Sequence, residues 1–578
     1  MRTSILTLTC VLGAIAAACS PLRQPLGSLT GASAGQAGNP GTAGSGNAGT
    51  SGGGTAGSAI PKTNQIPSIP PEWNDCDPNA TRCYRDPGVS PSSPVSELFG
   101  GAPDPDPAAK PVIVYPLDGA MHPINSADIT FQWRRGPAAA QTVFRIRLRR
   151  VGGDVFEFFV PCKQPAVSGP PVNTECVYRL PPGAWLDLAT TTRGESLVVD
   201  VAGVDLTRPG VVATSDSMTL AFSPEDVRGG FYYWSVGVNG TERVLFGTRT
   251  PQPFVSHKLP DCSGCHALSR DGARFAFEQG DTASGVLWVA PTATPQPQQS
   301  LFTPSATHDA GTQALNHDGT RVLVSTSGRL TLRDAATNKV LTEVTTNQLG
   351  MSQHAFHPEW SPDDRSVVVT VSALGDSDWS VRTGAIGVLP FQGDQFGNVD
   401  IVVPTGTATG DDFNFYPTWS PDGHWIAFAT APIGPMQTSY KQINARLRLV
   451  NRDTKIVYDL AAASGSPGHG ATMPKFAPFT QAGGLMILTF HSKLDYGFYV
   501  TGAGTAQLWM TVIDVGKLHV PTDEASRPPV WLPFQDWKSG NYAGVWAETV
   551  GCHVENGTSV GCGDGEICNQ GACAMVGP

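Results

Sequence analysis

The sequence predicts an all-β protein with two folded domains. Short runs rich in Val, Ile, Phe and Tyr recur along the chain between turn residues, and the 578 residues include 65 glycines and 49 prolines. Such runs are typical of β-strands. No long stretch of the sequence has the apolar period of about 3.6 residues that marks an amphipathic helix. We therefore expect a β-sandwich followed by a six-bladed β-propeller.

Residues 1–18 have the features of a lipoprotein signal peptide. Arg2 supplies a positive charge, and the following stretch is apolar apart from two threonines. Three alanines then precede Cys19, which resembles a lipobox and implies a lipid on Cys19; a secretory signal with a chance cysteine is the alternative. Because Ser20 is not the aspartate that would imply inner-membrane retention, we expect an exported outer-membrane lipoprotein that faces the periplasm or the cell surface.

Two segments without a predicted core follow the signal. Residues 19–65 consist mainly of small residues and are expected to form a flexible linker. Residues 66–109 are expected to be a short Cys-containing connector. No later stretch of the sequence has 18 consecutive apolar residues, so the lipid is the only membrane contact that we expect. The net charge of −11, without a basic block, excludes nucleic acid as a partner.

Twelve cysteines favour an oxidising compartment. Cys10 leaves with the signal, and those beyond Cys19 fall into local groups. Each group allows local disulfides, and the last group allows about three connectivities. The groups are Cys76 with Cys83, Cys162 with Cys176, Cys262 with Cys265, and the set Cys552, Cys562, Cys568 and Cys573 in a small disulfide module at residues 549–578.

Residues 110–225 are expected to form the sandwich. The runs at 111–116 and 129–133 predict two strands, and residues 144–149 alternate between apolar and basic side chains as in a half-buried strand. The segment resembles an Ig-like or fibronectin-type module. Such a module implies a spacer or adhesive unit, and we assign no chemistry to it.

Residues 226–548 contain an internal repeat. Five turn segments recur at intervals of 45 to 59 residues, and an apolar strand follows each. A repeat of this length is typical of one propeller blade, and its Asp-Gly pair makes the tight turn between two strands. A degenerate sixth unit is expected around 528–546. The five segments begin at Leu268, Leu315, Trp360, Trp419 and Phe476.

This repeat resembles the PD40 repeat of TolB-like β-propellers. Residues 419–428 read Trp-Ser-Pro-Asp-Gly-His-Trp-Ile-Ala-Phe and nearly copy that pattern. The first repeat departs from it at Leu268 and Arg270, and the fifth lacks the Asp-Gly turn. The resemblance covers residues 258–548 and implies a TolB-like propeller. Because the repeat residues build blades, they are given no catalytic role.

The motif Cys262-Ser263-Gly264-Cys265-His266 stands just before the first repeat. Two thiols at this spacing can form thioethers to the vinyl groups of a haem, and the adjacent imidazole can bind its iron. We therefore expect one covalent c-type haem. A Cys262–Cys265 disulfide and a zinc site are the alternatives. The motif fused to a first repeat resembles a group of exported bacterial PD40 proteins.

The register of the repeat indicates where a sixth iron ligand would come from. Cys265 matches His357, Tyr416 and Met473, and these positions should surround one mouth of the central channel. A Met ligand would raise the haem potential relative to a second His, and an open sixth position is the alternative. The candidates are Met473, His357, His308, His354 and His469.

Three functions are consistent with these features. The first is electron transfer or redox sensing by the haem, with a redox partner. The second is a non-enzymatic scaffold that binds a protein or glycan at the propeller mouth, with Cys262–Cys265 as a disulfide. The third is a hydrolase, which we disfavour because the folded part has no Gly-x-Ser-x-Gly motif, and Asp411 and Asp412 have no evident carboxylate partner. Whether the protein is an enzyme stays open.

Overall fold

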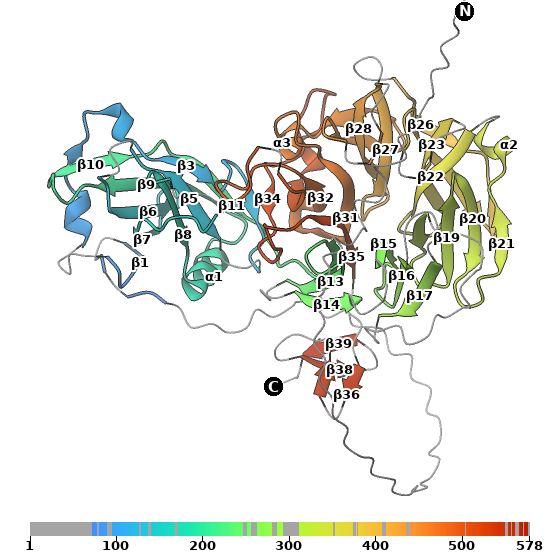
Figure 1. Ribbon diagram of the computed structural model, residues 1–578, viewed down its shortest axis with the longest axis horizontal. Helices are drawn as coiled ribbons and strands as arrows, with labels where there is room; N and C mark the ends of the chain where they lie inside the picture. The colour runs from blue at the N-terminus through green and yellow to red at the C-terminus, as the bar shows by residue number, and fades with distance from the viewer. Residues whose placement is uncertain are drawn as a thin grey trace, which may run out of the picture.

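The computed structural model describes residues 72–548 with internal gaps, the longest at 256–262 and 293–310, together with two hairpins within 553–575. The signal, the linker, Cys19, Cys262, His308, Cys552 and Cys562 lie outside the described residues. Within the described part, no helix is long and apolar enough to cross a membrane. The structure is nearly all β, with an N-terminal domain beside a larger radial domain (Figure 1).

The N-terminal domain consists of two sheets and one helix. Its larger sheet has the strand order β1-β7-β6-β9-β10-β2, and β11 and β4 pair at its side; the smaller sheet has the order β3-β5-β8. The strands are β1 (Arg82–Arg85), β2 (Ala102–Pro103), β3 (Val112–Tyr115), β4 (Met121–His122), β5 (Thr130–Arg134), β6 (Val143–Arg149), β7 (Val155–Pro161), β8 (Glu175–Arg179), β9 (Ser196–Val204), β10 (Val211–Thr214) and β11 (Met218–Phe222). Aromatic and aliphatic residues of both sheets are fully buried in one core.

Two features of this domain differ from the expectation. The segment expected to be a connector supplies β1 and β2, which pair in parallel with β7 and β10. Helix α1 (Pro182–Thr191) interrupts the strands, begins with a proline in its first turn and buries Trp185 and Leu188. A proline at this position and an apolar pair near the four-residue helical spacing are local helix signals.

The radial domain is a β-propeller, as the repeat predicted. Six sheets are found among its described strands, and their innermost strands contact one another in the closed order β35-β15-β18-β22-β27-β31-β35. The inner and second strands are β15 (Ser263–Leu268), β16 (Arg274–Gln279), β18 (Thr312–Leu315), β19 (Arg321–Thr326), β22 (Gln353–Trp360), β23 (Ser366–Ala373), β27 (Asp412–Trp419), β28 (Trp425–Pro432), β31 (Thr472–Gln481), β32 (Leu485–Ser492), β35 (Asn541–Ala547) and β12 (Gly230–Ser235).

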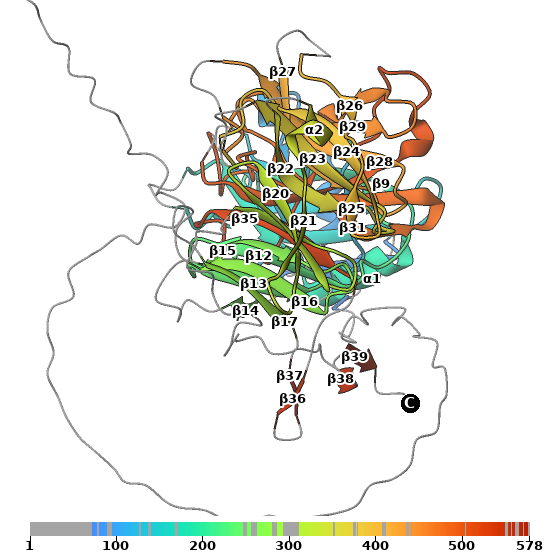
Figure 2. The same cartoon turned by 90° about the vertical axis from the view of Figure 1, so that its right-hand side faces the viewer.

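The outer strands complete these sheets. They are β13 (Gly240–Leu245), β14 (Gln252–Val255), β17 (Val286–Pro291), β20 (Arg329–Asp334), β21 (Val340–Glu343), β24 (Ala385–Gln392), β25 (Gln395–Phe396), β26 (Asp400–Val403), β29 (Arg446–Asn451), β30 (Val457–Asp459), β33 (Gln507–Ile513) and β34 (Val530–Trp531). Short helices α2 (Thr346–Leu349) and α3 (Ala461–Ser464) lie in connections, and hairpins β36–β37 (His553–Glu555, Thr558–Val560) and β38–β39 (Glu566–Asn569, Ala572–Met575) lie beyond the β14 edge (Figure 2).

The ring is closed by pairing strands from the two ends of the propeller. The sequence predicted a sixth unit around 528–546. In the structure, β12 pairs with β35, so the sixth sheet combines residues 230–255 with residues 541–547. Trp546 of β35 is buried against Phe231 and Phe246, and its indole Nε1 donates a hydrogen bond to Thr489 Oγ1 at 3.0 Å. This side chain therefore joins the closing sheet to its neighbour.

The repeated Ser and Asp side chains have the same role in successive blades. The hydroxyl of Ser269 donates to Asp271 Oδ1 at 2.7 Å, and that of Ser361 donates to Asp363 Oδ1 at 2.6 Å. The same contact joins Ser420 to Asp422, and each Asp also accepts a backbone N–H two residues later in the chain. These bonds fix the turn between the first two strands, so the repeat residues build blades.

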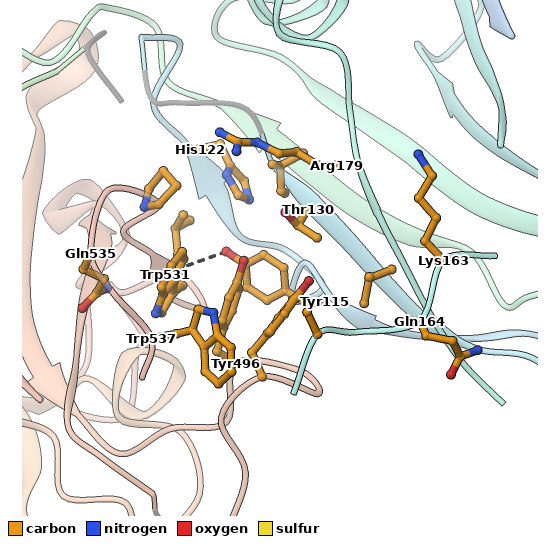
Figure 3. A pocket seen from close by; sticks show the side chains of 16 residues that line it. Tyr115, His122, Thr130, Lys163, Gln164, Arg179, Tyr496, Trp531, Gln535 and Trp537 are labelled. Atoms are coloured by element: carbon orange, nitrogen blue, oxygen red, sulfur yellow. Dashed lines mark hydrogen bonds between the residues drawn. The ribbon is translucent and has the colours of Figure 1, made fainter. Parts of the chain in front are cut away.

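The two domains share a contiguous hydrophobic core. Buried residues of the N-terminal sheets and of the sheet β31–β34 belong to the same cluster. Tyr115 Oη accepts a hydrogen bond from the Trp531 N–H at 3.1 Å (Figure 3). Gln132 Oε1 accepts one from the Phe498 N–H at 2.8 Å. Buried polar bonds of this kind fix the register of two packed surfaces.

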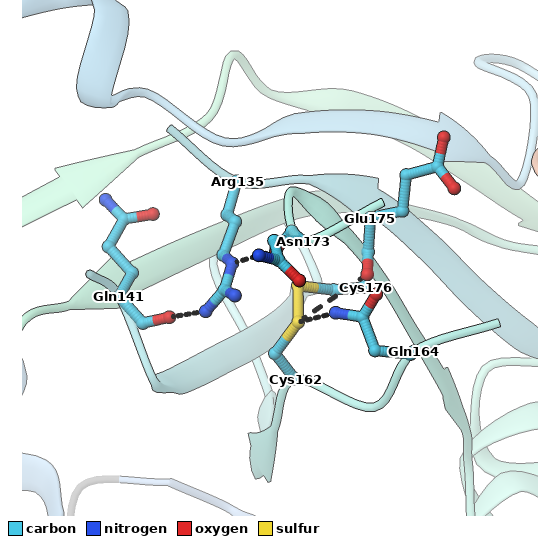
Figure 4. Close-up of a disulfide and its surroundings, with 7 residues drawn as sticks. All are labelled: Arg135, Gln141, Cys162, Gln164, Asn173, Glu175 and Cys176. Carbon is cyan, nitrogen blue, oxygen red and sulfur yellow. Dashed lines mark hydrogen bonds between the residues drawn. A yellow bond between two sulfur atoms is a disulfide. The ribbon is translucent and has the colours of Figure 1, made fainter. Parts of the chain in front are cut away.

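Two disulfides stabilise the N-terminal domain. They join Cys76 to Cys83 and Cys162 to Cys176. Cys176 lies in β8, and its bond holds the loop that precedes that strand (Figure 4). Beside it, Arg135 donates to the carbonyl oxygens of Gln141 and Asn173 at 2.6 and 2.7 Å.

We expect Trp546→Ala to lower the free energy of unfolding by about 3–5 kcal/mol, because it removes a buried indole at the closure. Guanidinium unfolding measures this change. Trp425→Ala, at a half-buried tryptophan of β28, is the matched control and should cost less. Equal losses in the two variants would contradict a special role for the closing sheet.

Stability should fall on acidification because buried histidines stay neutral in the fold. Burial lowers the pKa of His491 to about 4 and that of His122 to about 3. An unfolded histidine has a pKa of about 6.5, so this stability is complete above that pH and is lost as the pH falls toward the folded-state pKa. The loss is about 1.4 kcal/mol per pH unit and per histidine. We therefore expect His491→Asn to lose about 2 kcal/mol less than the parent between pH 7 and 5 in guanidinium unfolding; an unchanged pH slope would refute this.

Candidate functional site

The inner strands of the propeller share an unusual backbone position. His357, Tyr416, Met473 and Ala543 have φ values of 51°, 50°, 48° and 49°. Non-glycine residues rarely adopt this left-handed conformation, which costs of order 1–3 kcal/mol. Three of these residues are the ones that the repeat aligns with Cys265. The ring of inner strands therefore carries a regular bulge, and in β15 the pairing register shifts between Gly264 and Ala267 at the matched place.

Polar side chains meet two residues beyond this bulge. Lys475 Nζ forms an ion pair with Glu359 Oε2, and Glu359 Oε1 accepts hydrogen bonds from Thr418 Oγ1 at 2.7 Å and the Trp419 N–H at 2.8 Å. Glu359 lies in β22 and Lys475 in β31, and β27 separates these strands. Because they meet across β27, both side chains point toward the propeller axis. The matched places in β15, β18 and β35 hold Ala267, Ala314 and Val545, so half of the ring is polar and half apolar.

His266 is the described member of the Cys-x-x-Cys-His motif whose side chain is placed. Its ring is 8% exposed and stacks on Phe275, with 5.6 Å between ring centroids. Burial lowers its pKa to about 4, and the charge of Lys475 acts in the same direction. The backbone oxygens of Tyr232 and Ala543 face the ring, but among the described residues neither ring nitrogen has a partner in hydrogen-bond geometry. An imidazole buried in this way is costly unless a partner satisfies it.

His357 is held by protein groups on both sides of its ring. Nδ1 accepts the Tyr416 N–H at 3.3 Å and lies 3.1 Å from Thr370 Oγ1. Nε2 therefore carries the proton and donates to the Asp378 carbonyl oxygen at 2.7 Å. The ring also lies against Tyr416, with 3.9 Å between centroids, and burial lowers its pKa to about 3. Binding iron at His357 would require breaking one of these bonds.

The other predicted sixth ligands are spread over several places. Met473 is half-buried in β31 and packs against the cluster that contains Phe356 and Tyr416. His354 is half-buried in β22 beside Phe356. His469 precedes β31, and its Nδ1 lies 3.0 Å from the Ser466 carbonyl oxygen. Met473 is the candidate of this group at the bulge position, two inner strands away from β15.

A buried carboxylate near the axis was not anticipated from the sequence. Asp378 accepts hydrogen bonds from Ser325 Oγ at 2.7 Å, the Ser327 N–H at 2.9 Å and Thr312 Oγ1 at 3.1 Å. Burial raises its pKa. Its carbonyl oxygen also holds His357 of β22, so Asp378 joins the sheet β18–β21 to the sheet that contains β22. It lies in a connection outside the repeat pattern, which is why the alignment of repeats gave no signal for it.

Asp412, one of the two acidic residues considered for a hydrolase, makes a structural ion pair. Asp411 lies outside the described residues. Asp412 is buried in β27, and its Oδ2 accepts a hydrogen bond from Arg446 Nη2 at 2.8 Å. Such a contact between a carboxylate and a guanidinium anchors β29 to β27.

Comparison with solved structures finds chains of low sequence identity and low TM-score. No family model and no curated protein matches the chain. It is similar to Kuenenia stuttgartiensis hydrazine synthase (12% identity, 48% of this chain and 71% of that one, TM-score 0.31). It is also similar to dihydro-haem d1 dehydrogenase NirN (15%, 52% and 56%, 0.31) and to the Cps50 β-propeller domain of Myceliophteria thermophila (13%, 52% and 90%, 0.29). Each likeness covers about half of this chain.

We expect Asp378→Asn to lower the free energy of unfolding by about 1–3 kcal/mol, because an amide cannot accept all three donors equally well. Guanidinium unfolding followed by tryptophan fluorescence measures the change. Asp453→Asn, at an exposed position of the turn after β29, should change stability by less than about 0.5 kcal/mol. The same midpoint for both variants would show that Asp378 does not join the sheets.

Proposed function

We propose that this chain is an exported, lipid-anchored β-propeller that carries one covalent c-type haem and acts in electron transfer or redox sensing. The observation that supports the proposal is the position of the Cys-x-x-Cys-His motif at the bulge of an inner strand. There, the buried His266 has no hydrogen-bond partner among the described residues. The proposal includes six TolB-like blades, an Ig/fibronectin-like N-terminal sandwich and a lipid on Cys19.

The residues of the motif fit the proposed group chemically. Cys262 and Cys265 would supply the two thioethers, and His266 would supply an axial nitrogen. Burial keeps His266 neutral, which is the form that can bind a metal. A haem supplies one-electron exchange at its iron. The unsatisfied nitrogens of His266 support this fit because iron would provide the missing partner for one of them.

The surroundings of the motif support a choice among the sixth ligands. His357 already uses both ring nitrogens, whereas Met473 has no hydrogen bond to break in the described part of the chain. Met473 also lies at the bulge position in β31. We therefore propose Met473 as the sixth ligand, which favours a higher potential than a second histidine would. The neighbouring Lys475 adds a positive charge, which Glu359 offsets.

The polar half of the inner ring supports one alternative. Glu359, Thr418 and Lys475 point toward the axis, and a protein or glycan bound at the mouth would meet them. In that case Cys262 and Cys265 would form a disulfide, and the propeller would be a binding scaffold without a haem.

Covalent haem decides between these functions. Residues 20–578, which lack the lipid-bearing Cys19, are exported in cells that mature c-type cytochromes, and the pyridine haemochrome of the denatured protein is measured. We expect one haem per chain, lost in the Cys262→Ala/Cys265→Ala variant because both thioethers are removed. The Cys568→Ala/Cys573→Ala variant changes two cysteines of the C-terminal hairpin and should keep the haem.

A colourless, folded protein would contradict the proposal. If Cys262 and Cys265 then resist alkylation until a reductant is added, the disulfide scaffold becomes the function to pursue. Haem retained by the Cys262→Ala/Cys265→Ala variant would equally contradict attachment at this motif.

A further inference from the structure

A cavity of ≈ 540 Å³ lies between the N-terminal domain and the sheet β31–β34 (Figure 3). Its volume is within the range of about 300–1,000 Å³ that is usual for small-ligand pockets. We propose that this cavity binds a small neutral phenol, with the aromatic ring against the edges of protein rings and the hydroxyl at His122. The proposal is independent of the haem and of the proposed function.

One wall of the cavity is a fixed stack of aromatic rings. Tyr496 lies parallel to Trp531, with 3.9 Å between centroids and an interplanar angle of 8°, and Tyr499 stacks on Tyr496 at 5.6 Å. Tyr115 packs edge-on against Tyr496 at 5.0 Å, and its hydroxyl accepts the backbone N–H of Trp531. Because both domains contribute to this wall, it is preorganised, and a ligand does not have to order it.

The stack favours an aromatic ligand because of the way its rings are turned. Stacked rings cover one another's faces, so they present their edges to the cavity. Ring edges carry a partial positive charge and attract the negative face of another aromatic ring, which gives the edge-to-face arrangement. Tyr499 and Trp537, with 5.2 Å between centroids, are both half-buried, so the cavity opens to solvent beside them.

The charged and amide groups of the lining already have partners within the protein. Lys163 Nζ pairs with Asp86 Oδ2 at 3.2 Å, and Arg179 also interacts within the protein. Gln535 Oε1 accepts the Leu508 N–H at 2.8 Å, and its Nε2 donates to the Leu508 carbonyl oxygen at 2.7 Å. No Asp or Glu is found among the described lining residues. A charged ligand would therefore have to compete with existing contacts, whereas a neutral one would not.

The remaining lining is mostly apolar. Apolar cavities in proteins stay dry and can take small aromatic molecules. The side chains concerned are those of Ile129, Ala166, Val177, Val530 and Pro533.

One buried polar atom of the lining calls for a hydroxyl. His122 is 2% exposed, lines the cavity, and its Nε2 has no hydrogen-bond partner in the part of the chain that the structure describes (Figure 3). Burial lowers the pKa of His122 to about 3, so the ring is neutral at pH 7. A neutral imidazole nitrogen either donates or accepts, and a phenol hydroxyl can do both, so it fits either tautomer. A ligand without a hydroxyl would leave this atom unpaired, which is unfavourable.

The test compares three molecules of similar size and shape. p-Cresol, toluene and 4-methylcyclohexanol are titrated into residues 20–578, which contain every described residue, by isothermal calorimetry at pH 7. We expect p-cresol to bind at least tenfold more tightly than toluene, which lacks the hydroxyl. We also expect p-cresol to bind at least fivefold more tightly than 4-methylcyclohexanol, which lacks the aromatic face.

Two variants with matched controls locate the binding. His122→Phe should abolish the preference for p-cresol over toluene, whereas His491→Phe should keep it. His491 is also buried and has an unpartnered nitrogen among the described residues, but it lies outside the lining. Trp537→Leu should weaken p-cresol and toluene at least threefold, whereas Trp425→Leu, at a half-buried tryptophan of another blade, should change neither. Unchanged thermal midpoints establish that the variants are folded.

A direct readout keeps the test valid if His122→Phe does not fold. In the parent protein with ¹⁵N-labelled histidine, p-cresol should shift the Nε2 resonance of His122 and leave that of His491 in place. Absence of p-cresol binding at millimolar concentration would overturn the proposal. Equal affinity for p-cresol and either of the other two molecules, or an unmoved His122 resonance at saturation, would overturn it as well.

Discussion

The left-handed bulge in the inner strands is the constraint on which the propeller axis depends. Four strands hold a non-glycine residue at φ near 50° in the same place. Each such residue is unfavourable by itself, so the surrounding sheets must over-determine it. The bulge turns the strand so that residues two places later face the axis, as Glu359 and Lys475 show by meeting across β27. The Cys-x-x-Cys-His motif lies at the matching place in β15, so the bulge fixes the direction of its backbone.

The buried polar groups near the axis differ in how many hydrogen bonds they make. Around His357 and Asp378, hydroxyls, backbone N–H groups and a carbonyl oxygen satisfy each buried polar atom that the contacts describe. Around His266, Phe275 stacks on the ring, and the backbone oxygens of Tyr232 and Ala543 face it outside ideal hydrogen-bond geometry. The two histidines therefore differ in their polar contacts, although both are buried and have low pKa values. Burial alone would not have distinguished them.

Local patterns in the sequence predicted the repeating part of this architecture. Each Trp-Ser-Pro-Asp-Gly turn lies within a single hairpin, so its sequence pattern can be recognised in one blade. Alignment of the repeats also matched Cys265 with His357, Tyr416 and Met473, and the last three share the same left-handed backbone conformation. The pairing of β12 with β35, the buried Asp378 and the cavity at Tyr496 depend on contacts between distant segments. No periodic signal marks such contacts, and β1 and β2, which pair with distant strands, were missed for the same reason. Helix α1 was missed although its proline and its apolar pair are local helix signals. The motif at Cys262 was visible because its chemistry lies within five consecutive residues.

The closing strand has a consequence for the order in which the chain is made. β12 is synthesised about three hundred residues before β35, the strand that covers its inner edge. Until β35 arrives, that edge has an unpaired row of backbone groups, which can recruit the wrong strand. A nascent chain cut short before residue 541 would keep this edge exposed. The ring can close only after the whole propeller has been translated. In an unfinished chain, the unpaired edge of β12 stays exposed, and proteases and chaperones can recognise it.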